Sequence, residues 1–247
     1  MQILTTAIIK GGTGKTTTAA ALLQAAACSG QRCLAIDLDP QANLTYSLAA
    51  NQNQAGAYQL LHEQEAQEVT QATAQNIDVI AGSPDLAAET TYPASARRLK
   101  AAIEPIKNEY DLIVIDTPPQ MGELMFNALY AATGLIIPLE ADNNSIQGLY
   151  QITDIANQIK GKTNPDLQIL GTVVTRYDAR PKLNRYLLDV IRDTGAEIGA
   201  PLLIAIRAAV AVKEAQAMQQ SLFEYAPKCK AAADYMELYE KIIKKRG

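Results

Sequence analysis

A glycine-rich stretch near the start of the chain constrains the fold more than any other feature. Residues 10–17 read K-G-G-T-G-K-T-T, between an apolar run over residues 3–9 and an alanine-rich run over residues 17–27. This order predicts a buried strand, a tight loop and a helix, which is the context of a phosphate-binding loop. In such a loop the backbone N–H groups point at the phosphates, and the helix adds its positive N-terminal dipole.

The residue types of the loop suit a nucleoside triphosphate with its metal. The glycines let the backbone approach an anion and adopt conformations that other residues disfavour. Lys15 is expected to reach the β- and γ-phosphates, and the Thr16 hydroxyl is expected to bind Mg²⁺. The predicted ATP-binding residues of this stretch are Lys10, Gly11, Gly12, Thr13, Gly14, Lys15, Thr16 and Thr17.

Two later apolar runs end in carboxylates. Residues 32–38 read R-C-L-A-I-D-L, and Asp37 and Asp39 would point to the same side of that strand before Pro40 stops it. Residues 111–119 read D-L-I-V-I-D-T-P-P, which is a Walker B arrangement with Asp116 in the Mg²⁺ shell. Because α/β proteins bind ligands at the carboxyl ends of parallel strands, Asp37 and Asp116 become candidate metal residues. A polar strand end followed by a turn is the plainer interpretation of Asp37 and Asp39.

The remaining chain alternates apolar strands with helical patterns. We expect further strands at residues 77–81, 134–139, 169–174 and 202–206, and helices at 124–132, 145–160, 183–193, 210–219 and 231–245. Residues 41–75 are polar and are interpreted as short helices only. A helix over 95–108 would place Arg97, Arg98 and Lys100 on a solvated face. The alternation predicts one α/β domain over residues 1–247, a P-loop NTPase with a doubly wound, mostly parallel sheet.

Composition narrows the class of protein. The 247 residues are 48% hydrophobic, which suffices for a large core. No apolar run reaches the ~20 residues of a membrane span, and residues 1–4 lack the features of a secretory signal. Three cysteines without metal-site spacing fit a reducing cytoplasm. A net charge of −4 argues against a strongly basic nucleic-acid binder. His62, the single histidine, is expected to be structural or solvated.

The glycine loop departs from the ordinary pattern in an informative way. The first glycine of G-x-x-x-x-G-K-[ST] is replaced by Ile9, and a second lysine, Lys10, precedes the glycine pair. K-G-G-x-G-K-T resembles the deviant Walker A sequence of ParA, MinD and the nitrogenase iron protein. Together with D-L-D-P-Q-A-N-L at residues 37–44, T-R-Y-D-A-R at 175–180 and the Walker B stretch, nearly the whole chain resembles the ParA (Soj-like) partition ATPases.

This resemblance implies a homodimer that closes face to face around two ATP molecules and Mg²⁺. Lys10 and Lys15 would neutralise phosphate charge, Lys10 across the interface, and Asp39 would orient the attacking water. Hydrolysis would be slow, and the ATP state would bind DNA without sequence preference. The implied partner is a ParB-like centromere-binding protein, and the implied location is the cytoplasm and nucleoid, with no membrane. The cargo would be a plasmid, a mobile element or a chromosome.

Other residues follow from the resemblance less directly. Thr175 stands where MinD-like proteins have an adenine-reading Asn, so Thr175 and Arg176 are adenine-side candidates. Arg207 matches a family Arg, although Ala208 replaces the Asn that often follows it, and Lys213 and Lys230 join it as DNA-binding candidates. No helix-turn-helix extension precedes the ATPase core in this sequence, which is typical of the short type.

Two alternatives stay open at this stage. One is a MinD-like positioning ATPase that acts on a membrane or a protein cargo. The other is an ATPase of the nitrogenase-iron-protein type, which would need paired cysteines at a dimer interface. Cys28, Cys33 and Cys229 lack that spacing.

Overall fold

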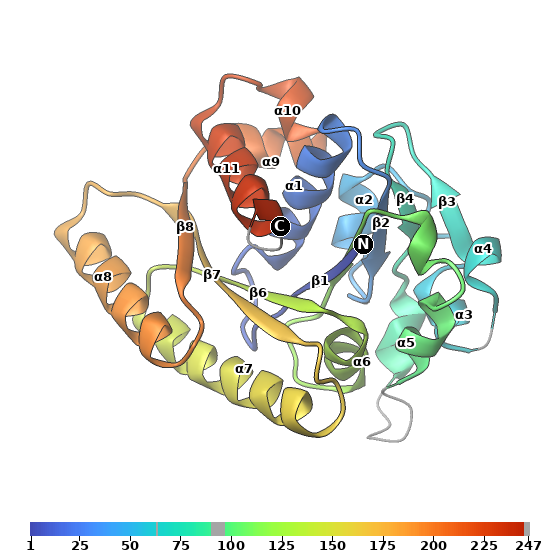
Figure 1. Cartoon of the computed structure of the whole chain (residues 1–247). Helices are drawn as coiled ribbons and strands as arrows, with labels where there is room; N and C mark the ends of the chain where they lie inside the picture. The colour runs from blue at the N-terminus through green and yellow to red at the C-terminus, as the bar shows by residue number, and fades with distance from the viewer. Residues whose placement is uncertain (63, 90–96, 245–247) are drawn as a thin grey trace.

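An eight-stranded sheet forms the centre of the computed structural model, which describes residues 1–62, 64–89 and 97–244 (Figure 1). The strand order is β3-β4-β2-β5-β1-β6-β7-β8, and every neighbouring pair is parallel except β3 with β4. The strands are β1 (Gln2–Thr6), β2 (Cys33–Asp37), β3 (Thr70–Ala72), β4 (Asp78–Ile80), β5 (Leu112–Asp116), β6 (Gly134–Leu139), β7 (Gln168–Tyr177) and β8 (Leu202–Arg207).

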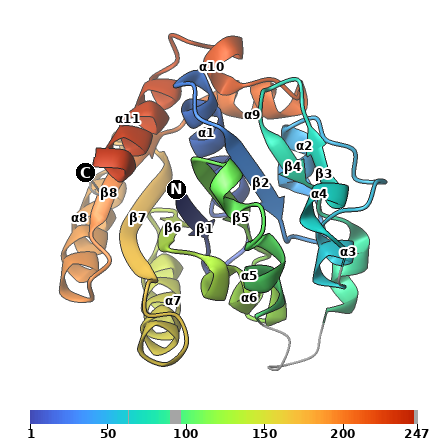
Figure 2. The ribbon, with the colours of Figure 1, turned by 45° about the vertical axis from the view of Figure 1, so that its right-hand side comes forward.

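Helices cover both faces of this sheet, as Figures 1 and 2 show. One face packs on α1 (Lys15–Cys28), α2 (Asn43–Ser47), α9 (Val210–Ala217), α10 (Leu222–Tyr225) and α11 (Lys230–Lys244). The other packs on α3 (Ala57–Leu61), α4 (Ala66–Val69), α5 (Arg98–Ile103), α6 (Glu123–Ala131), α7 (Asn143–Lys162) and α8 (Lys182–Glu197). Short 3₁₀ turns lie at Pro84–Ala88 and Lys107–Glu109.

The central strands are apolar because both of their faces are covered. All five residues of β5 are buried. Ile113 and Ile115 belong to the core under α6 and α7, whereas Leu112 and Val114 belong to the core under α1 and α11. Parallel strands buried in this way are expected to be continuous aliphatic runs. The predicted doubly wound, mostly parallel sheet is therefore confirmed.

One strand was not predicted from the sequence. β3 lies within residues 41–75, which were interpreted as short helices only, and it adds an antiparallel edge to the sheet. Its sequence, T-Q-A, carries almost no apolar signal because none of its residues is buried. The pairing of β3 with β4 is thus set by backbone hydrogen bonds at an edge, which sequence periodicity does not report.

The prediction for Arg98 was wrong. Its guanidinium forms ion pairs with Glu89 and with Glu123, whose side chain is only 1% exposed. Arg98 thus compensates a buried carboxylate, while Arg97 and Lys100 are exposed as expected. His62 contacts Glu89 at 2.7 Å between Nε2 and Oε1, which agrees with a structural role. The start of the helix predicted over 95–108 lies outside the described residues.

Strand register aligns the polar ends of three central strands. Asp116, the last residue of β5, pairs with Thr6 on β1 and with Asp37 on β2. Residues paired in parallel strands place their side chains on the same face. The carboxyl edge of the sheet therefore carries a threonine and two carboxylates side by side, directly below the loops that follow β1, β2 and β5.

A buried asparagine joins the ends of two helices, and its removal tests how the α6–α7 layer is held. Asn164, after α7, donates from Nδ2 to the carbonyls of Leu129 and Ala132 at 2.9 and 2.8 Å. Asn164→Ala leaves two buried carbonyls without a donor, so we expect the free energy of unfolding to fall by about 2–3 kcal/mol in urea titrations. Asn144→Ala, at an exposed position in α7, should change it by less than about 0.5 kcal/mol. Equal effects would contradict this account.

Candidate nucleotide-binding site

A cavity of about 1100 Å³ opens at the carboxyl edge of the sheet. Residues 11–17, which follow β1, form one wall, and Asp39, after β2, lies on the wall beside them. The segment after β5, Arg176 at the end of β7 and Gln216 on α9 complete the lining. A cavity where loops meet at the carboxyl ends of parallel strands is the expected ligand site of an open α/β sheet.

The glycine loop has the backbone of an anion-binding loop. Gly12 and Gly14 have positive φ of 72° and 87°, which is the left-handed region that glycine adopts without strain. A Cβ on Gly14 would lie 3.0 Å from Cγ2 of Thr175, so a side chain does not fit there. Gly11, also predicted to need this freedom, has no positive φ. Helix α1 begins at Lys15, directly after Gly14, and aims its N-terminus at the cavity.

Lys15 and Thr13 each contribute a buried hydrogen-bond donor to the loop. Lys15 is 7% exposed, and its Nζ donates to the carbonyl of Lys10 at 3.0 Å, across the loop. The Thr13 hydroxyl is buried and has no hydrogen-bond partner. Burial lowers the pKa of Lys15, and the charges of Asp116 and Asp39 oppose that shift. A phosphate in the cavity would give the Lys15 ammonium an anionic acceptor in addition to the Lys10 carbonyl.

Thr16 and Asp116 form a site that suits Mg²⁺. The Thr16 hydroxyl donates to Oδ2 of Asp116 at 2.6 Å, and the Thr6 hydroxyl donates to Oδ1 at 3.1 Å. Mg²⁺ usually keeps several waters and takes one or two protein ligands together with phosphate oxygens. Among the described residues no cluster of three His, Cys, Asp or Glu could hold a metal by itself. The donor set therefore fits a metal that arrives with a nucleotide.

The two buried carboxylates destabilise each other's charged form. Both Asp116 and Asp37 are fully buried, and burial is the main cause that raises their pKa values. The charge of Asp37 raises the pKa of Asp116 further, whereas the Thr16 hydroxyl and Lys15 lower it. A divalent cation at this edge would stabilise the charged carboxylate.

The structure separates Asp37 from Asp39. Asp37 does not line the cavity; its Oδ2 accepts from the backbone N and the hydroxyl of Thr45 at 2.9 and 2.8 Å, and its Oδ1 accepts from the Asp39 backbone N. It thereby fixes the start of α2. Asp39 lies on the cavity wall, where the Gln41 backbone N orients its Oδ1 at 2.9 Å. Asp116 does not line the cavity either, but it is hydrogen-bonded to Thr16, which does, whereas Asp37 is bonded to Thr45. Asp116 is therefore the better-placed metal candidate, and Asp37 holds the start of α2.

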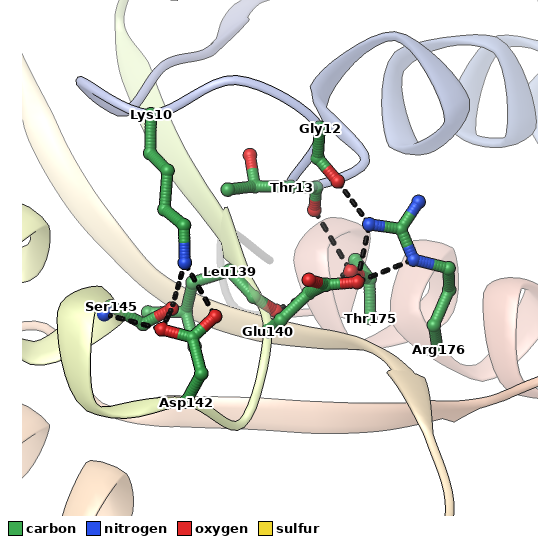
Figure 3. A network of polar contacts seen from close by, with 9 residues as sticks. All are labelled: Lys10, Gly12, Thr13, Leu139, Glu140, Asp142, Ser145, Thr175 and Arg176. Carbon is green, nitrogen blue, oxygen red and sulfur yellow. Dashed lines mark hydrogen bonds and ion pairs between the residues drawn. The ribbon is translucent and has the colours of Figure 1, made fainter.

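Lys10 does not line the cavity, and its side chain extends towards Asp142 and Ser145 (Figure 3). Its Nζ forms an ion pair with Asp142, which caps the N-terminus of α7, and lies 3.5 Å from the Ser145 hydroxyl. Asp142 also accepts from the Ser145 backbone N at 2.9 Å. The second lysine of the loop is thus tethered to the segment after β6 and is not among the residues that surround its own cavity.

Thr175 and Arg176 contact the loop itself. The buried Thr175 hydroxyl donates to the Thr13 carbonyl at 2.8 Å, and Thr175 does not line the cavity. Arg176 does line it, and its guanidinium contacts both the Gly12 carbonyl and Glu140 (Figure 3). Of the two, Arg176 alone lines the cavity, and the adenine-side role stays a prediction for both. Thr175 holds the loop.

Sequence reasoning missed Glu140 and Asp142, which hold Arg176 and Lys10. Both follow β6 in the stretch P-L-E-A-D at residues 138–142. Since β6 was predicted with its observed bounds, its carboxyl end was a known place to search. The available signal was the one used for Asp39 and Asp116, namely acidic residues directly after a buried parallel strand. Gln216, which donates to the Thr17 hydroxyl at 3.2 Å, carried no such signal.

Two of the three predicted DNA-binding residues, Arg207 and Lys230, meet at the end of β8. Arg207 ends β8 and is ion-paired with Asp234, whose side chain is 8% exposed. Its Nη2 also donates to the Lys230 carbonyl at 3.3 Å. Lys213 on α9 and Lys230 at the start of α11 are exposed. Asp234 therefore offsets the charge of Arg207, although the Arg207 side chain is exposed like those of the two lysines.

Comparison with known proteins decides the family. A family model described as an AAA domain matches residues 1–169. The chromosome partitioning protein ParA of Caulobacter vibrioides is 34% identical, and the match covers 98% of this chain and 94% of that protein. The sporulation initiation inhibitor protein Soj of Bacillus subtilis is 32% identical, with 94% of each covered. The chain belongs to the ParA/Soj-like partition ATPases. It is an ATPase, as members of this family are.

A solved structure extends this comparison to ligands. Cobyrinic acid a,c-diamide synthase from Mycobacterium smegmatis, with a bound ATP analogue and magnesium, matches with a TM-score of 0.84 and 29% identity. The match covers 100% of this chain and 96% of that one. A nucleotide and magnesium therefore occur together on this fold in a protein similar to this chain.

Within the part of this chain that the structure describes, no helix is long and apolar enough to cross a bilayer.

The buried charge of Asp116 yields a pH-dependent prediction. Its folded-state pKa is raised above the unfolded value, so its contribution to stability is lost as pH rises through the raised value. The loss begins above the unfolded pKa of about 4 and is complete only above the raised folded value. Without Mg²⁺, Asp116→Asn should therefore raise the free energy of unfolding at both pH 5 and pH 8, and by about 2–3 kcal/mol more at pH 8. Urea titrations at both pH values measure this. Asp166→Asn, at an exposed carboxylate, controls for the charge change. A loss of stability at pH 8 would contradict the prediction.

Proposed function

We propose that this ParA/Soj-like protein is an ATP-dependent dimerising switch that partitions DNA. Its ATP state is a homodimer with Mg²⁺ that binds DNA without sequence preference, and slow hydrolysis to ADP and phosphate ends that state. The observation that carries the proposal is the meeting of Lys15, Thr16 and Asp39 at one cavity, with Asp116 hydrogen-bonded to Thr16 behind the cavity wall. These are the charge-neutralising, metal-holding and water-orienting groups that phosphoryl transfer needs.

Each group has a distinct task in hydrolysis. Lys15 lies at the start of α1 and neutralises charge on the β- and γ-phosphates. Thr16 and Asp116 would hold Mg²⁺, which would supply further positive charge to the same phosphates. Asp39, fixed by the Gln41 backbone N, orients the water that attacks the γ-phosphate. Hydrolysis breaks the bond between the γ-phosphorus and the bridging oxygen, and ADP and phosphate leave.

Lys10 supports dimerisation rather than binding within one subunit. Asp142 holds its ammonium group outside the cavity, so Lys10 does not neutralise charge at its own site in this conformation. Exchange of the Asp142 carboxylate for the phosphates of a second subunit would preserve an anionic partner for Lys10 at little electrostatic cost. In the monomer, the ion pair with Asp142 thus holds a lysine that would act on the phosphates of the second subunit.

DNA binding would depend on the dimer. The chain carries a net charge of −4, so one subunit is a poor polyanion binder. Lys213 and Lys230 lie on neighbouring elements of one face, together with Arg207. Two such faces in one dimer would double the number of cations that contact phosphates, which makes binding steeply dependent on dimerisation. The partner that triggers release would be a ParB-like centromere-binding protein, in the cytoplasm at the nucleoid.

Three substitutions test the switch in calorimetry, size exclusion and phosphate-release assays. Asp39→Ala should bind ATP and dimerise normally but release phosphate at least about 100-fold more slowly, because the water loses its acceptor. Lys10→Ala should bind ATP yet stay monomeric. Lys15→Ala should lose ATP binding. Lys100→Ala, at an exposed position on α5, is the matched lysine control.

The outcomes separate the assignments. Wild-type phosphate release by Asp39→Ala would move the water-orienting role to another residue. An unchanged ATP-dependent dimer of Lys10→Ala would exclude action in trans. ATP affinity that survives Lys15→Ala would overturn the nucleotide site.

DNA retention on random duplex is expected with ATP and not with ADP, and it should weaken as salt rises. The double variant Lys213→Ala/Lys230→Ala should reduce the salt slope by about two for each subunit that contacts DNA. Lys160→Ala, exposed on α7 on the other side of the sheet, should leave the slope unchanged. Arg207→Ala is unsuitable for this test because it leaves the mostly buried Asp234 carboxylate without its ion-pair partner Arg207. Equal retention in both nucleotide states would refute the switch, and ATP-dependent sedimentation with anionic vesicles instead of DNA would favour a MinD-like function.

A further inference from the structure

We propose that Arg176 and Glu140 are a positioning pair that holds the phosphate loop in its binding shape. The pair joins the end of β7 to the segment after β6, and Arg176 is the member that contacts the loop (Figure 3). Arg176 Nε donates to Oε1 of Glu140 at 2.5 Å, and its Nη2 donates to the Gly12 carbonyl. The inference rests on the proposed nucleotide site, and it gives the pair the role of fixing the phosphate loop of that site.

The backbone of β7 is distorted in a way that aims Arg176 at the loop. The pairing of β7 with β8 shifts register between Val174 and Tyr177, so Thr175 and Arg176 lie in an irregular stretch. Arg176 has φ of 50°, a left-handed conformation that costs a non-glycine residue about 1–2 kcal/mol. Bulges of this kind redirect a side chain out of the regular alternation. The chain thus tolerates strain at the residue that reaches Gly12.

A hydrogen bond to the Gly12 carbonyl can fix the conformation of the phosphate loop. For the loop N–H groups to face an anion, the neighbouring carbonyls must point outward and find donors there. Gly12 has φ of 72°, and a Cβ on it would meet no atom within 4 Å, so no packing of its own restrains it. The Arg176 guanidinium supplies a donor to this carbonyl, and the Thr175 hydroxyl supplies one to the next, that of Thr13. Fixing the loop before binding removes part of the ordering entropy from the binding step.

Substitution of Glu140 can show whether Arg176 positions the loop or contacts the nucleotide directly. Arg176 lines the cavity, so its loss would weaken binding under either explanation, whereas Glu140 does not line it. If Arg176 only contacted the phosphates, removal of the neighbouring negative charge would leave ATP affinity unchanged or raise it. If the pair positions the loop, loss of Glu140 releases the guanidinium and weakens binding despite the more favourable charge.

ATP affinity with Mg²⁺, measured by calorimetry, tests this opposition. We expect Glu140→Gln and Arg176→Ala each to weaken binding about tenfold, and the double variant to bind no worse than Arg176→Ala, because the two residues act as one unit. Arg176→Lys should not restore affinity, since a lysine lacks the planar fork that spans Glu140 and Gly12. Unchanged or tighter binding by Glu140→Gln, or full rescue by Arg176→Lys, would overturn the proposal.

A measurement without nucleotide separates this inference from the proposed function. In the free protein, Glu140→Gln and Arg176→Ala should speed amide hydrogen exchange in residues 11–14 by about tenfold, with melting temperatures within about 2 °C of wild type. Unchanged exchange in this loop would overturn the pair even if ATP binds. If the variants exchange faster but the wild-type protein does not bind ATP, the positioning role of the pair stands and the nucleotide site is refuted.

The matched control lies in the same segment. Arg180 and Asp178 form an ion pair of 2.8 Å between Nη2 and Oδ2, and the Arg180 side chain is 91% exposed. This pair has the same two charges as Arg176 and Glu140 and lies at the β7 end that carries Arg176, but within the described part of the chain the Arg180 guanidinium is hydrogen-bonded to Asp178 and not to the loop. Arg180→Ala and Asp178→Asn should change neither loop exchange nor ATP affinity. Effects as large as those of Arg176→Ala would show that any charge change at this strand end disturbs the loop.

Discussion

The register of β1, β5 and β2 is the constraint on which the rest of the site depends. It places Thr6, Asp116 and Asp37 at one level of the sheet, with Asp116 in the middle. The hydrogen bond from Thr16 to Asp116 then ties the phosphate loop to that level. A one-residue slip of any of these strands would turn the carboxylate to the opposite face. The apolar residues that alternate along β5 oppose such a slip, because both faces are fully packed.

The site combines unfavourable burial at its centre with favourable contacts at its rim. Burial raises the pKa of Asp116 and lowers that of Lys15, so each group favours its neutral form more than it would in water. At the rim, Asp142 pairs with Lys10, Glu140 pairs with Arg176, and Thr175 holds the Thr13 carbonyl. The outer contacts fix the loop, while burial disfavours the charged forms of Lys15 and Asp116 at the centre. This division is what preorganisation for a phosphate ligand with a metal requires.

The fold and the inner part of the site followed from the sequence because their signals are local. Glycine spacing specified the loop, and an aliphatic run ending in Asp specified β5 and the metal-side carboxylate. The edge strand β3 left no signal, since its three residues are not buried. The partners of Arg98, Arg207 and Lys10 were missed for a different reason: Glu123, Asp234 and Asp142 are 25, 27 and 132 residues away along the chain. Charge pairing over such separations depends on packing and not on periodicity.

The contact between Arg176 and Gly12 has a consequence for biosynthesis, because it spans 164 residues of sequence. The ribosome makes the phosphate loop among the first residues, yet the guanidinium that steadies it emerges on the order of ten to thirty seconds later at ordinary elongation rates. The central strand β1 also waits for β5, whose residues pair with it across a separation of 110 positions. Nascent chains therefore pass through a long interval in which the glycine loop exists without its support. Competence for nucleotide arrives late in translation, and a chain released early would carry the motif without the means to use it.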